Sequence, residues 1–133
     1  MSLKTVKKGA DFEAKKRWLK RYLKSVEKLN RLFDREWEIV RHGNMSDHDR
    51  SILTQIDHEK ADIRRSMNVS HSEIHHAAEN LNDEIETQVL ILYFINGHSF
   101  KQIADMLHYS ERQIIRYYVS GINNAEIKGV SEM

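Results

Sequence analysis

The sequence predicts an all-α protein in which a long antiparallel helical hairpin is followed by a small helix bundle. Proline is absent and only five of the 133 residues are glycine, so little interrupts a helix. Apolar residues recur at helical spacing along most of the chain. We expect residues 1–81 to form the hairpin, as a unit for interaction and oligomerisation, and residues 82–133 to form the bundle.

The first expected element is one amphipathic helix from Asp11 to Arg41, closed by Gly43-Asn44. Its apolar residues recur every seven positions, as in a coiled-coil seam. They are Phe12, Leu19, Val26, Phe33 and Val40, flanked by Tyr22, Leu23, Leu29 and Trp37. Such a helix is roughly 45 Å long at 1.5 Å per residue. This stripe is longer than a lone hairpin can bury, so the hairpin is expected to pack on the C-terminal unit, on a second copy of the chain, or on both. We expect a homodimer.

The second expected element starts after Ser46, where Asp49 can complete a reciprocal cap. Residues 68–70 could begin a new helix, but the apolar pattern continues past them in seven-residue steps, which favours one helix. The pattern consists of Ile52, Ile56, Ile63, Met67, Ile74, Ala78 and Leu81. The short connection between the first two elements predicts that they are antiparallel neighbours.

Charge is unevenly distributed along the chain. Residues 1–41 carry 13 Lys and Arg against 6 Asp and Glu, whereas residues 42–90 carry 4 against 10. Ion pairs between these two helices would mainly fix how the helices align along each other. They would add little stability, because each exposed ion pair contributes about 0–1 kcal/mol. A basic run on the first helix is either a solvated face or an additional DNA contact. It comprises Lys15, Lys16, Arg17, Lys20, Arg21 and Lys24.

A third helix is expected to begin at Leu81-Asn82-Asp83-Glu84, a stretch that suits a helix break and an N-cap. Residues 86–95 are more apolar than an exposed helix tolerates, and Gly97 closes the segment. We therefore expect this helix at the centre of the bundle. The tail from Asn123 has weak periodicity and is expected to fray.

Residues 98–122 have the pattern of a helix-turn-helix. Two capping signals stand eleven residues apart, Ser99-x-x-Gln102 and Ser110-x-x-Gln113. His108 occupies the turn position where glycine is usual, and histidine tolerates a left-handed backbone better than most residues. The inner faces are expected to hold Ile103, Ala104 and Leu107 on the first helix, and Ile114 with Tyr117 or Tyr118 on the second.

The second helix of this motif would present polar and basic groups outward, which suits the DNA major groove. Its outward residues are Ser110, Glu111, Arg112, Ile115, Arg116 and Val119. The expected DNA-binding residues are Lys101, Ser110, Glu111, Arg112, Gln113 and Arg116. The bundle has few other basic residues, so we expect weak binding by a monomer, because phosphate contacts supply most non-specific affinity.

Residues 85–122 resemble region 4 of the sigma-70 family of RNA polymerase factors. The segments LILYFINGHS, FKQIADMLHYS and SERQIIRYY carry the resemblance. With long helices ahead of this module, the chain is similar to Gram-positive phage late-gene regulators of the ArpU and RinA type. The resemblance implies a sequence-specific transcriptional activator that binds double-stranded DNA, acts with RNA polymerase and works in the bacterial cytoplasm. An activator needs a second surface away from the DNA-reading helix, and the candidates are the acidic residues Asp83, Glu84 and Glu86.

Other chemistry has little support in the sequence. No apolar run approaches the roughly twenty residues that span a bilayer, and no secretory signal is visible. His71 and His75 have the spacing of metal ligands on a helix, but no third ligand is evident. We therefore expect no metal, no cofactor, no small-molecule substrate and no enzymatic activity.

Two alternatives to a DNA-binding regulator remain open at this point. One is a helical module that binds polymerase or a sigma factor but not DNA. The other is a DNA-packaging protein of the small-terminase kind, which also combines long helices with a helix-turn-helix.

Overall fold

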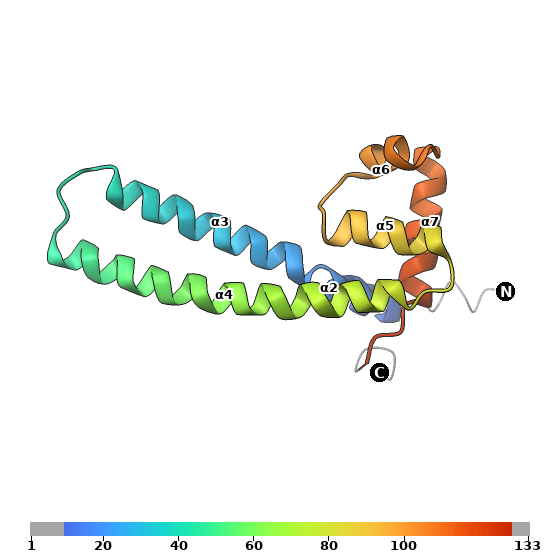
Figure 1. The fold of residues 1–133 in the computed structure, drawn as a ribbon, viewed down its shortest axis with the longest axis horizontal. Coiled ribbons are helices and arrows are strands. Elements are labelled where there is room, and N and C mark those ends of the chain that lie inside the picture. The colour runs from blue at the N-terminus through green and yellow to red at the C-terminus, as the bar shows by residue number, and fades with distance from the viewer. Residues whose placement is uncertain (1–9, 129–133) are drawn as a thin grey trace.

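The computed structural model describes residues 10–128, which form helices α2 to α7 and contain no strand (Figure 1). The helices are α2 (Ala10–Leu19), α3 (Arg21–Val40), α4 (Asp47–Glu79), α5 (Glu84–Phe94), α6 (Phe100–Leu107) and α7 (Glu111–Asn124). The predicted all-α class is confirmed for these residues. Between residues 10 and 128, no helix combines the length and the apolar content that crossing a bilayer requires.

The two longest helices, α3 and α4, run antiparallel and project away from the other helices (Figure 1). Gly43 turns the chain between them with a φ of +81°. The predicted cap at the start of α4 is confirmed, because Ser46 Oγ accepts from the Asp49 N–H at 3.1 Å and Asp49 Oδ2 accepts from the Ser46 N–H at 3.2 Å. The helix then continues through residues 68–70 without a break, as predicted.

The single helix expected from Asp11 to Arg41 is wrong, because the structure has two helices separated at Lys20. Backbone hydrogen bonds from Lys20 to Lys16 and from Lys24 to Lys20 are kept, at 3.0 and 3.1 Å. Beside the break, the Trp18 carbonyl accepts a hydrogen bond from Arg21 Nε at 2.9 Å. The break allows α2 to pack against α7 while α3 packs against α4.

The expected seven-residue stripe is also only partly buried. Phe12 and Leu19 enter the core, but Phe33 and Val40 are 39% and 45% exposed. A strict seven-residue repeat drifts by about 20° per heptad on a straight α-helix, so its later members rotate out of the seam. Leu32 occupies the buried position instead, and the outer half of α3 keeps an uncovered apolar face.

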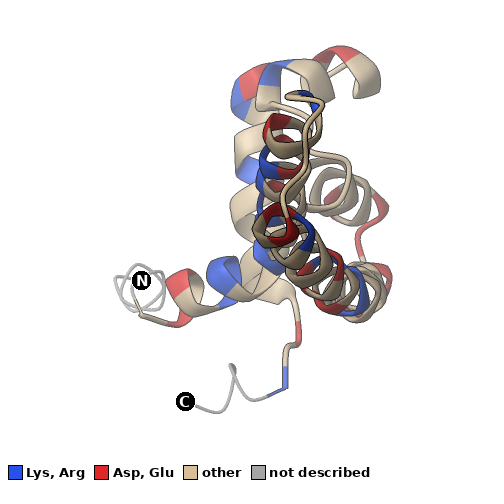
Figure 2. Ribbon diagram, turned by 90° about the vertical axis from the view of Figure 1, so that its left-hand side faces the viewer, with Lys and Arg blue, Asp and Glu red and all other residues tan. Residues whose placement is uncertain are grey.

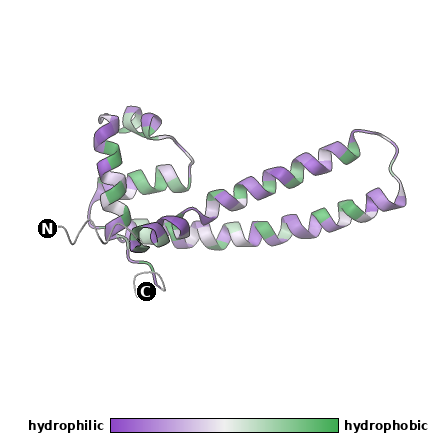
Figure 3. Ribbon diagram, turned by 180° about the vertical axis from the view of Figure 1, so that it is seen from behind, coloured by the Kyte–Doolittle hydropathy of each residue, from purple (hydrophilic) through white to green (hydrophobic). Residues whose placement is uncertain are grey.

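One core joins both halves of the chain around α5. Val89, Leu90 and Phe94 of α5 are fully buried, and Figure 3 shows this helix as predominantly hydrophobic. The same cluster includes Leu19 of α2 and Ile74 of α4. One core therefore contains residues from both sides of the boundary at residues 81–82 that the sequence predicted.

The expectation that the tail frays from Asn123 is wrong as far as residue 128. Ala125 and Ile127 follow α7 and are both almost completely buried in the core. The end of α7 is held by α2, because Lys15 Nζ donates to the Asn123 carbonyl at 3.0 Å. These tertiary contacts, rather than local periodicity, order the segment, and residues 129–133 lie outside the described part.

Candidate nucleic-acid interface

Two reciprocal caps define where α6 and α7 begin, and both were predicted. At α6, the Ser99 N–H donates to Gln102 Oε1 at 2.9 Å and the Gln102 N–H donates to Ser99 Oγ at 3.2 Å. At α7, Ser110 and Gln113 repeat the arrangement at 3.0 and 3.2 Å. Each cap satisfies backbone N–H groups that the helix itself cannot pair.

The turn between α6 and α7 depends on a left-handed residue, as the sequence predicted. His108 has φ +62° and ψ +43°, and it is the one non-glycine residue with positive φ in the described chain. The next residue, Tyr109, donates its N–H to the Ala104 carbonyl at 3.1 Å. This backbone geometry ends α6 and redirects the chain into α7.

Aromatic packing fixes the inner face of α7. Tyr118 is buried, and its ring lies 4.9 Å from the rings of Tyr93 and Phe100 and 5.6 Å from that of Phe94, measured between centroids. Burial raises the pKa of the Tyr118 phenol, so this group stays neutral. Tyr118, and not the half-buried Tyr117, is therefore the inner aromatic residue that the sequence left undecided.

The expectation that Glu86 belongs to an exposed acidic surface is wrong, because its buried carboxylate ties α7 to α5. Glu86 is 6% exposed and accepts hydrogen bonds from Ser120 Oγ at 2.6 Å and from Asn124 Nδ2 at 3.3 Å. Beside it, Gly121 lets the two helices approach closely, since a Cβ there would lie 3.2 Å from Leu90 Cγ. One acidic residue within an apolar run was the available signal for this contact.

The outer face of α7 carries the two arginines expected to contact DNA. Arg112 and Arg116 are exposed and lie four residues apart, so they share one side of the helix. Lys101 is exposed in the first turn of α6. Between residues 10 and 128, these three cations form no ion pair, which leaves them available for an anionic partner.

The other expected contact residues divide into two groups. Ser110 and Gln113 are exposed, but their side-chain oxygens are engaged in the cap of α7. Glu111 is exposed in the first turn of α7, and Ile115 is an exposed apolar residue on the same helix. The free contact groups on α7 therefore centre on Glu111, Arg112 and Arg116.

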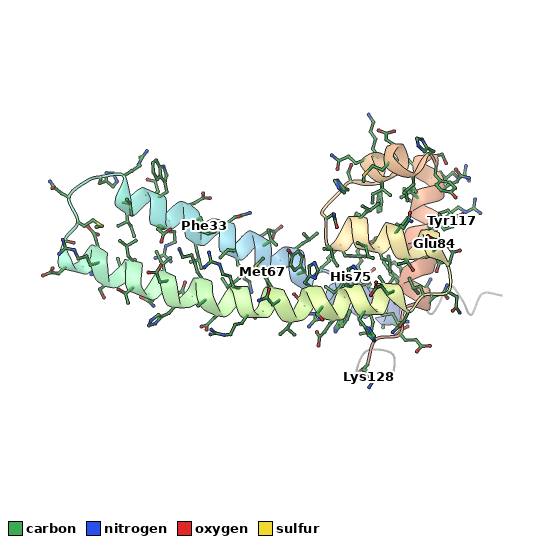
Figure 4. The ribbon with its side chains drawn as sticks, viewed as in Figure 1. Phe33, Met67, His75, Glu84, Tyr117 and Lys128 are labelled. Atoms are coloured by element: carbon green, nitrogen blue, oxygen red, sulfur yellow. The ribbon has the colours of Figure 1, made fainter. Side chains whose placement is uncertain are left out.

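A tyrosine pair lies beside this face. The rings of Tyr109 and Tyr117 meet edge to face with 5.5 Å between their centroids. The neighbouring Tyr109 is the main cause that raises the pKa of Tyr117. The Tyr117 hydroxyl is a hydrogen-bond donor at neutral pH, as any tyrosine hydroxyl is. Figure 4 shows Tyr117 on α7, at the end of the molecule far from the turn between α3 and α4.

The basic run on the first helix is divided by the fold. Lys15 is buried against the end of α7, and Arg21 pairs with Glu73 of α4 at 2.7 Å. Arg17 and Lys24 are exposed. Figure 2 shows basic and acidic segments interspersed along the helices.

The histidines of α4 do not form a metal centre with other groups. The rings of His71 and His75 stack at 6.0 Å, and His75 Nδ1 lies 3.1 Å from Glu79 Oε1. In the part of the chain that the structure describes, no three His, Cys, Asp or Glu side chains are arranged as metal ligands.

Sequence and structure comparisons add no relative to this description. No protein-family model, curated protein or solved structure matches the chain.

Proposed function

We propose that this protein is a sequence-specific DNA-binding transcriptional regulator. In this proposal residues 98–122 form a helix-turn-helix of the sigma-70 region 4 type, and α3 and α4 form the interaction hairpin. The observation that carries the proposal is the pair Arg112 and Arg116, exposed and without an ion pair in the described chain, on a helix whose opposite face is fixed in the core. A rigid helix with free cations on one side suits major-groove recognition.

Glu111, Arg112, Ile115 and Arg116 on α7 each have a matching chemistry in the major groove. An arginine donates two hydrogen bonds to O6 and N7 of guanine, and a glutamate such as Glu111 accepts from N4 of cytosine. Ile115 is positioned for apolar contact with a thymine methyl group. Lys101 and the Tyr117 hydroxyl are suited to phosphate oxygens, which position the protein without reading sequence.

The resemblance to phage late-gene regulators supplies the activating role, action with RNA polymerase and the bacterial cytoplasm. An activator needs a second surface for polymerase, and the acidic start of α5 is available for it. Glu84 is exposed there, whereas the side chain of Asp83 caps α5 at 2.8 Å from the Ile85 N–H. Because Glu86 is buried, Glu84 is the position at which charge reversal tests this surface.

DNA binding is tested with the full chain by fluorescence anisotropy against random duplex and against sequences selected from a random pool. Arg112→Ala and Arg116→Ala should each cost about 1–3 kcal/mol on the selected sequence, if each removes a bidentate base contact. Arg50→Ala, at the far end of α4, is the matched control and should leave affinity unchanged. Equal affinity of the double variant and the wild type would remove α7 from the interface.

The same measurements separate the two alternatives. Absence of any DNA binding, together with capture of polymerase or a sigma factor, would favour the interaction module. Selective binding to a packaging site by a ring-shaped oligomer would favour the terminase-like protein.

A further inference from the structure

The outer half of α3 presents apolar side chains that the fold does not cover. Phe33, Trp37 and Val40 recur at helical spacing, and Trp37 is 63% exposed. A single exposed apolar residue is common on a protein surface, but here three large ones share one face of a helix. Their place near the turn of the α3/α4 pair separates them from the core around α5 (Figure 1).

One edge of this stripe is already closed by α4. Lys60 Nζ lies 4.9 Å from the centroid of the Phe33 ring, and the Arg64 guanidinium lies 5.8 Å from it. Lys60 also pairs with Glu36 of α3 at 2.9 Å. The opposite edge carries Asp34 and Arg41 and remains open to solvent.

We propose that this stripe binds a second copy of the chain, with the outer halves of the two α3 helices packed antiparallel. Trp37 occupies position a of a heptad, Phe33 and Val40 occupy position d, and Asp34 and Arg41 both occupy position e. Position e of one helix faces position e of the other in an antiparallel pair. Asp34 of each copy therefore meets Arg41 of the other, twice in one symmetric dimer.

The charges on the open edge favour a second copy over an unrelated partner. Asp34 forms no ion pair with another described residue, and Arg41 makes an exposed contact with Glu38 at 3.4 Å. Arg41 retains helical backbone angles, φ −66° and ψ −16°, so it continues the register of α3. The edge is thus complementary to itself when reversed, which is what a two-fold interface requires.

This dimer has a consequence that rests on the proposed function. Trp37 is separated from Leu19 by eighteen residues, roughly 27 Å of helix. The two α6/α7 units would lie at opposite ends of the dimer, more than roughly 50 Å apart. Half-sites one helical turn apart are only about 34–36 Å from centre to centre. The dimer would therefore connect two separate DNA sites instead of filling adjacent half-sites.

The interface is tested by sedimentation velocity of the full chain without DNA, from about 1 to 100 μM. We expect a reversible dimer that Trp37→Ser weakens at least about tenfold, as for a central aromatic contact. Val69→Ser is the matched control, since Val69 is an exposed apolar residue of α4 away from the stripe. Circular dichroism of each variant checks that the helices are intact. A wild type that is monomeric throughout, or a dimer that Trp37→Ser leaves unchanged, overturns the proposal.

Charge exchange tests the antiparallel register. Asp34→Arg and Arg41→Asp should each weaken the dimer several-fold, because each places like charges opposite one another. The double variant restores opposite charges across the interface, so its dissociation constant should return to within about twofold of the wild type. If the two substitutions acted independently, their losses in affinity would add instead. Failure of the double variant to recover contradicts the pairing. Since no DNA is present, this outcome is independent of whether α7 binds DNA.

Discussion

Replacing His108 with glycine should stabilise the protein, because His108 holds the left-handed turn between α6 and α7 at φ +62°. A left-handed backbone costs a residue with a Cβ about 1–2 kcal/mol. Glycine avoids this cost but loses about 0.4–1 kcal/mol through the greater freedom of the unfolded chain. His108 is exposed, so little packing is lost. We expect a net gain of about 0.5–1 kcal/mol in the free energy of unfolding.

Urea denaturation followed by circular dichroism measures this difference directly. His76→Gly is the matched control, since His76 is an exposed histidine within α4 and should lose roughly 0.3–0.5 kcal/mol on the same substitution. His108→Val should be destabilising, because a β-branched side chain tolerates positive φ poorly. If His108→Gly were as destabilising as His76→Gly, the turn would not have the left-handed geometry and the reasoning would be refuted.

Two further changes test other parts of the structure. Ile127→Ala should lower the free energy of unfolding by about 2–5 kcal/mol, because Ile127 is buried in the core. If urea denaturation shows no change in this free energy, the segment after α7 does not pack on the core. Glu84→Lys should leave DNA affinity nearly intact but reduce transcription from the target promoter in a purified system. If purified protein represses every promoter that it binds, the activating role is wrong.

The parts of the fold predictable from sequence were those set by neighbouring residues. The caps at Ser46, Ser99 and Ser110 are local hydrogen-bond patterns, so short spacing rules suffice to find them. The left-handed turn at His108 was predicted for the same reason. The exposed position of Arg112 and Arg116 followed from the 3.6-residue period of α7, once its inner face was identified.

The features that sequence missed depend on contacts between distant residues. The break at Lys20 arises where the chain passes from packing on α7 to packing on α4. Ile127 is ordered by a core made mostly by other helices, and its own segment has no periodicity to reveal it. The sequence suggested that Glu86 shares an acidic surface with Asp83 and Glu84, because its partners Ser120 and Asn124 lie more than thirty residues away.

These distant contacts determine how α7 can present its arginines. Tyr118 packs on one side, Glu86 accepts a hydrogen bond from Ser120, and Lys15 donates to the Asn123 carbonyl, so α7 has little freedom to rotate about its axis. A base-reading helix needs this rigidity, because hydrogen bonds to base edges depend on position and direction. The few cations on α6 and α7 give little non-specific attraction to phosphate. In the proposed function, DNA binding would therefore depend on the fixed geometry of α7 at each site and on the proposed dimer, which links two sites, rather than on bulk charge.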